Sequence, residues 1–187
     1  MLAGIASLAL FATIIVDLAT SRLIPVFGFP YSDLGRTIYI AVLMSTLWGL
    51  VGLHAHLEGR YGWLGTSGFL AAYVGDTLAL VGLGLTWLFR GNILGQEPAI
   101  TLGLSGMVVG RLLLGLGFLV WGVATFRTGA LPKSYGLALV VAFVVVLDSI
   151  VFPASLGSYA VTLVLGLVWL ALGSLLWKAR DRSPSYQ

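Results

Sequence analysis

Long apolar runs separated by short polar or turn-forming segments make up almost the whole chain. A transmembrane helix needs about 20 mainly apolar residues, because the bilayer's hydrocarbon core is about 30 Å thick and a helix rises about 1.5 Å per residue. The pattern therefore predicts an all-α, polytopic membrane protein with six transmembrane helices in one domain, residues 1–187. The expected spans are residues 2–19, 37–56, 64–89, 104–126, 135–152 and 158–177.

The composition supports this class. The chain is 59% apolar and 9% charged, with a mean hydropathy of +1.03, whereas about a quarter of the residues of a typical soluble domain are charged. The net charge is +3, but the ten basic residues are scattered and form no basic helix face. The expected surroundings are therefore the lipid bilayer of the cell membrane, and nucleic acid is not an expected partner.

The residue inventory predicts no cofactor and no metal ion. The absence of cysteine excludes thiolate metal sites, iron–sulfur clusters and thiol catalysis. Lys133 and Lys178 both fall at span ends, so no lysine is placed to form a retinal Schiff base. His54 and His56 are two residues apart, so they point in opposite directions on a helix and do not suit one metal ion.

The basic residues also predict an orientation. Six lie in the second and fourth loops and the C-terminal tail, namely Arg60, Arg127, Lys133, Lys178, Arg180 and Arg182, against three in the other loops. Because cytoplasmic loops carry an excess of Lys and Arg, both termini are expected to face the cytoplasm.

An internal repeat is expected, since four features of one segment recur at a nearly constant separation in a later segment. Asp17 and Trp169 suggest a weaker third copy, so the chain is predicted to form three helical hairpins related by an axis along the membrane normal. The matched positions are Gly35–Arg36 with Gly110–Arg111, Trp48 with Trp121, Tyr61–Gly62 with Tyr135–Gly136, and Asp76 with Asp148.

The candidate site consists of the charges inside the spans: Asp17, Asp76, Arg111 and Asp148. Each unpaired charge costs about 2.5 to 3.5 kcal/mol at the bilayer centre on insertion scales, so these residues are expected to be paired, neutralised or hydrated. Arg111 is predicted to pair with Asp76 or Asp148 in the outer half of the bundle. The remaining acid would bind a proton or a ligand, and Tyr73, on the face of Asp76, would assist.

Two structural alternatives stand beside this interpretation. An Arg–Asp pair can simply fix the register of the helices, and Tyr73 can be an ordinary packed aromatic. Gly103, Gly110 and Gly117 recur every seven residues, and this stripe is predicted to pack inside the bundle rather than to form a dimer.

Three functions fit this pattern. The first is binding or transport of a small molecule, ion or lipid, with a small amphipathic ligand as the expected partner. The second is an accessory or structural subunit of a larger membrane complex. The third is an intramembrane enzyme that transforms a lipid or terpenoid and uses an Asp as general acid, although an enzyme is the less favoured class because no hydrolase or nucleotide motif is present.

Overall fold

A computed structural model describes residues 33–57, 59–89, 97–129, 132–151, 166–171 and 173–174. This part of the chain contains helices and no strands, which confirms the all-α class. The labelled helices are α2 (Asp33–Leu57), α3 (Gly62–Phe89), α4 (Glu97–Thr128) and α5 (Lys133–Val151). Residues 166–171 and 173–174 are helical and fall inside the last predicted span. The first predicted span, residues 2–19 with Asp17, lies outside the described residues.

Three of these helices contain segments long and apolar enough to cross a membrane: Ile40–Leu57, Gly62–Phe89 and Pro98–Thr128. A shorter apolar stretch covers Lys133–Leu147 in α5. The structure is therefore compatible with a membrane protein. Its helices α3 and α4, of 28 and 32 residues, are about 42 and 48 Å long at 1.5 Å per residue.

The helix ends follow local chemistry. α4 begins at Glu97 and has Pro98 in its first turn, where a missing N–H costs nothing. Gly129 follows its end with φ = 63°, and the Gly129 N–H donates to the Thr125 carbonyl at 3.1 Å. A glycine in this left-handed conformation is a common helix stop. The predicted fourth span, 104–126, is thus extended in both directions.

The turn between α2 and α3 is tight. Gly59 and Gly62 have φ values of 79° and 62°, which residues with a Cβ rarely adopt. The Arg60 N–H donates to the Leu57 carbonyl at 2.9 Å. The two helices therefore run antiparallel from this turn.

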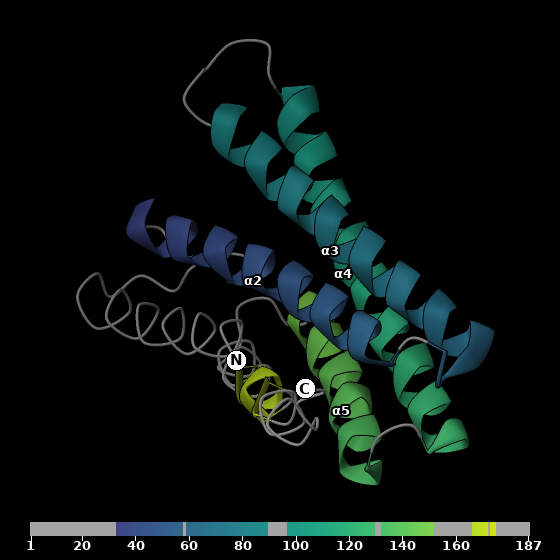
Figure 1. The fold of residues 1–187 in the computed structure, drawn as a ribbon. Coiled ribbons are helices and arrows are strands. Elements are labelled where there is room, and N and C mark those ends of the chain that lie inside the picture. Colours follow the sequence, from purple (N-terminus) through teal and green to yellow (C-terminus); the bar gives the residue numbers. More distant parts are fainter. Residues whose placement is uncertain are drawn as a thin grey trace.

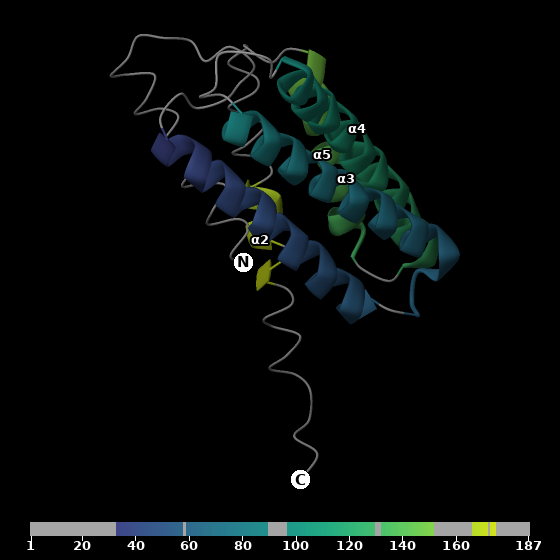
Figure 2. The same ribbon diagram turned by 90° about the horizontal axis from the view of Figure 1, so that it is seen from above.

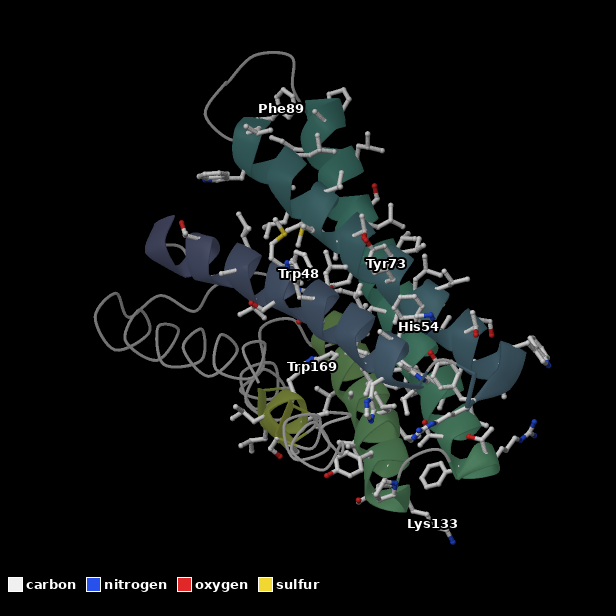
Figure 3. All side chains as sticks on the ribbon, in the orientation of Figure 1. Trp48, His54, Tyr73, Phe89, Lys133 and Trp169 are labelled. Atoms are coloured by element: carbon white, nitrogen blue, oxygen red, sulfur yellow. The ribbon has the colours of Figure 1, made fainter. Side chains whose placement is uncertain are left out.

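The arrangement is a layered set of antiparallel helices. α3 and α4 lie side by side along most of their length, α5 packs against α4, and α2 crosses the pair at an angle (Figures 1 and 2). Phe89, at the end of α3, and Lys133, at the start of α5, lie at opposite ends of the molecule (Figure 3).

The contact between α3 and α4, here called the glycine seam, brings the two backbones together. A Cβ placed on Gly110 would lie 2.5 Å from the Ala79 nitrogen, and one on Gly103 would lie 2.8 Å from the Gly82 oxygen. Gly117 likewise faces the backbone of Ala72. The predicted packing of this stripe inside the bundle is confirmed, because small residues allow such close approach.

Two apolar clusters fill the space between the helices. The large cluster includes Leu50, Leu114 and Trp121 and lies toward the α2–α3 turn. The small cluster consists of Leu43, Leu83 and Met107, with Ile40 and Leu80 packed against it. A short stretch of each of α2, α3 and α4 separates the two clusters, and the candidate site lies there.

Candidate functional site

Asp76 lies on the face of α3 that meets α2. Leu80 and Leu83 pack with Leu43 of α2, and Phe69 stacks on His54 of α2. Asp76 is seven residues from both Phe69 and Leu83 and four from Leu80, and helix residues at these spacings share a face. The carboxyl group therefore enters the interface between α2 and α3.

Asp76 is completely buried, with 0% of its surface exposed. Neither carboxyl oxygen has a hydrogen-bond partner among the described residues. Most buried polar groups in proteins are hydrogen-bonded, so an orphaned carboxyl needs an explanation in function, in an unseen partner or in a bound proton. This is the most unusual feature of the described part of the molecule.

Asp76 belongs to a level of the bundle here called the polar layer, formed by Thr46, Asp76 and Arg111. Thr46 separates Leu43 from Leu50 on α2, and Arg111 separates Met107 from Leu114 on α4. Each polar residue thus falls between a member of the small cluster and a member of the large cluster. Three adjacent helices therefore each carry one polar residue at the level between the two apolar clusters.

The other members of the polar layer donate no hydrogen bond to the Asp76 carboxyl. The Thr46 hydroxyl is buried and donates to the Val42 carbonyl at 2.9 Å, so it is engaged within its own helix. Gly75 faces Gly110 and Leu114 across the glycine seam, which puts Asp76 and Arg111 at the same level. Both Asp76 oxygens lack a hydrogen bond among the described residues, so no hydrogen bond joins Arg111 to Asp76, and their pairing stays a prediction.

Arg111 lines a groove between α4 and α5. The groove has a volume of about 120 Å³ and a mainly apolar wall that includes Gly115, Phe143, Leu147 and Ile150. Asp148 belongs to the stretch of α5 that contains Leu147 and Ile150, but its side chain lies outside the described residues. The alternative pairing of Arg111 with Asp148 therefore remains a prediction.

Tyr73 is placed differently from Asp76. It is 38% exposed, and its ring lies 5.8 Å from that of Phe69. Three residues rotate a helix by about 300°, so Tyr73 and Asp76 are about 60° apart around α3. That difference is enough to leave one side chain buried and the other at the surface. The predicted role of Tyr73 beside Asp76 stays a prediction.

A second polar group sits in an aromatic cluster beside the α2–α3 turn. The His54 imidazole stacks on Phe69 with centroids 4.0 Å apart and planes 7° from parallel, and its Nδ1 is hydrogen-bonded to the Tyr61 hydroxyl. Trp121 packs edge-on against both Tyr61 and Phe69, at 6.0 and 5.9 Å. This cluster joins α2, α3 and α4 beside the α2–α3 turn, and its member on α2, His54, is labelled in Figure 3.

The spacing of His54 and His56 speaks against a shared metal ion but does not predict the contact of His54 with Tyr61. The signal was present, because the two residues in contact lie seven positions apart on either side of a turn that contains Gly59. Among the residues in the described ranges, no group of three or more His, Cys, Asp or Glu side chains is close enough to hold a metal ion.

Trp48 and Trp121, the tryptophans matched in the predicted repeat, have unlike surroundings. Trp48 is 77% exposed, whereas Trp121 is fully buried at 0%. Trp121 also keeps a buried Nε1–H for which no hydrogen-bond acceptor is found in the described part. Their burial gives the repeat no support, and equivalence of the two hairpins stays a prediction.

The chemistry open to this site is that of one enclosed carboxyl, one cation at the same level and an apolar frame. Such a group can hold a proton, accept a hydrogen bond or pair with a cation. No family model, curated protein or solved structure matches this chain.

Proposed function

We propose that this chain is a multi-pass membrane protein that binds a proton or a small ligand at Asp76, and that this binding serves transport of a small molecule, ion or lipid. The observation that supports the proposal is the orphaned carboxyl of Asp76 in the interface between α2 and α3. An ionisable group inside a membrane segment is costly and usually marks an ion path or a proton relay. A group kept only for packing would be hydrogen-bonded or replaced by an apolar residue.

Arg111 has a supporting role in this proposal. It lies at the level of Asp76 and borders the groove toward α5, so it places a permanent positive charge near the acid without neutralising it through a hydrogen bond. The same ligand- or proton-binding region is proposed to include Asp17, Asp148 and Tyr73, with Asp17 and Asp148 at a common depth.

Infrared spectroscopy of the purified protein tests the binding role. A protonated carboxyl has a carbonyl stretch that an ionised one lacks, so raising the pH should remove a band from the wild-type spectrum. Asp76→Asn should lack that band, while Asp181→Asn, a change in the polar tail, should retain it. A pH-dependent spectrum identical in wild type and Asp76→Asn would contradict proton binding at Asp76.

The proposed topology has six spans in three hairpins with both termini in the cytoplasm, supported by the distribution of basic residues. Because the chain has no cysteine, single cysteines report the side of the membrane without background. A cysteine at Ser183 should be protected from an impermeant reagent outside the cell, and one at Asn92 should react. The opposite result would reverse the orientation.

A second candidate function, an accessory subunit of a membrane complex, is favoured by Trp48. This large side chain is 77% exposed near the middle of the apolar stretch Ile40–Leu57, although tryptophans usually prefer the membrane interface near helix ends. A partner helix would cover it. Isolation of the protein in a complex of fixed stoichiometry, lost in Trp48→Ala, would favour this function.

A further inference from the structure

We propose that the ligand of Asp76 is a proton and that this proton controls how closely α2 packs against the α3–α4 pair. With the carboxyl neutral, α2 closes over it as the structure shows, and with the carboxyl ionised, α2 moves away and admits water. This inference rests on the proposed function, because it specifies what Asp76 binds and what the binding does.

Asp76 is enclosed by protein. It lies between the two apolar clusters with 0% of its surface exposed. A bound molecule or hydrated ion would need room beside the carboxyl. A proton needs none, so it is the ligand that the packed arrangement accepts without rearrangement.

The two interfaces of α3 differ in how easily they can separate. α3 and α4 meet backbone to backbone at the glycine seam, where the neighbours of Gly110 are backbone atoms of Gly75 and Ala79. Backbone atoms cannot change rotamer to make room. α2 meets α3 through side chains such as Leu43, Leu80 and Leu83, which can separate and repack. Motion in response to Asp76 is therefore expected in α2.

The charges around Asp76 come from three helices. From α2, the polar group at its level is Thr46, whose hydroxyl is already donated to Val42, and His54 packs on Phe69, seven residues before Asp76. From α4, Arg111 is at the same level and borders the groove toward α5. On α3 itself, Asp76 is the one Asp, Glu, Lys, Arg or His between Gly62 and Phe89, and the other titratable side chain there is Tyr73. No described side chain offers an ionised Asp76 a hydrogen bond, so ionisation requires water and hence opening.

The aromatic cluster predicts where opening occurs. His54, Tyr61, Phe69 and Trp121 tie α2 to α3 and α4 next to the α2–α3 turn. This end acts as a pivot. The opposite end of α2, around Ile40 and Met44, is expected to move furthest.

The test measures distances between spin labels on this naturally cysteine-free chain. Met44→Cys with Val81→Cys spans α2 and α3 near the expected opening, and Val81→Cys with Val108→Cys spans the glycine seam. All three side chains are about half exposed, so labels are tolerated. Raising the pH should lengthen the first distance and leave the second unchanged, and adding Asp76→Asn should abolish the change in the first pair.

The outcomes separate this inference from the proposed function. If infrared spectra show that Asp76 loses its proton while both distances stay constant, proton binding stands and the movement of α2 is refuted. If the first distance lengthens equally in Asp76→Asn, another group is the trigger and the inference fails. If Asp76→Asn does not fold, Asp76→Leu replaces it and should hold the short distance at every pH; lengthening there refutes the inference as well.

Discussion

The two faces of α3 are built in opposite ways. Toward α4 it presents the small residues Gly68, Gly75 and Gly82, and the two backbones touch. Toward α2 it presents Leu80 and Leu83, together with Asp76. One interface therefore depends on the absence of side chains, and the other depends on large side chains with a polar group between them.

This difference shows where a polar group can be kept inside an apolar bundle. A backbone contact through glycine leaves no room for a carboxyl and no freedom to adjust. A side-chain interface contains Asp76 at the gap between two apolar clusters and can hydrate it by separating. The glycine seam thus keeps α3 and α4 in fixed contact, whereas the side chains between α2 and α3 can rearrange.

The largest change in stability is expected when a side chain is added at a glycine of the glycine seam. In Gly110→Ala the new Cβ would lie 2.5 Å from the Ala79 nitrogen and 2.6 Å from the Gly75 oxygen, so the helices must move apart. We expect a loss of about 1 to 3 kcal/mol in the free energy of unfolding, measured by equilibrium denaturation in detergent. Gly84→Ala is the matched control, because nothing lies within 4 Å of its Cβ. Equal losses in the two variants would contradict the backbone contact.

At the interface with α2, in contrast, a substitution is expected to raise the free energy of unfolding. Asp76→Leu replaces an orphaned buried carboxyl by an apolar side chain of similar size, which should stabilise the fold by about 1 to 2 kcal/mol and abolish the infrared band of Asp76. Thr46→Val is the control in the same layer. Its hydroxyl is satisfied by Val42, so its loss should not stabilise the protein. Destabilisation by Asp76→Leu would reveal a partner that holds the carboxyl.

The helices of the described region could be predicted from the sequence because their signals are local. The runs of apolar residues predicted the order of the four labelled helices. The ends were less accurate: α4 begins at Glu97, seven residues before the predicted span, because the residues after Glu97 are themselves mostly apolar and belong to the stretch Pro98–Thr128. Six spans and the orientation remain predictions.

The site could be predicted only in part. Asp76 and Arg111 stood out because charges are rare in apolar runs, and they do lie at one level. Which way each one faces depends on the rotation of α3 and α4 about each other, and that rotation is set by the glycine seam. The same rotation leaves Tyr73 at the surface and buries Trp121 against Tyr61, neither of which a spacing of residues along one helix reveals.

The smallest change in stability is expected at the aromatic cluster, where α2 is proposed to pivot. Tyr61→Phe keeps the ring that packs edge-on against Trp121 and removes the hydroxyl that bonds His54 Nδ1. Because His54 is only partly buried, water can replace the lost partner in part, and the free energy of unfolding should fall by about 0.5 to 1.5 kcal/mol. Tyr73→Phe is the control, since the Tyr73 side chain is 38% exposed and its change in the free energy of unfolding should be close to zero.

If α2 pivots at this cluster, Tyr61→Phe should also broaden the distance distribution between labels at Met44 and Val81 at low pH, while the distribution for the pair across the glycine seam stays narrow. A fall in stability equal to that of Tyr73→Phe, with no broadening, would mean that the tie between α2 and the α3–α4 pair is made by the stacking of His54 on Phe69 and not by the hydrogen bond.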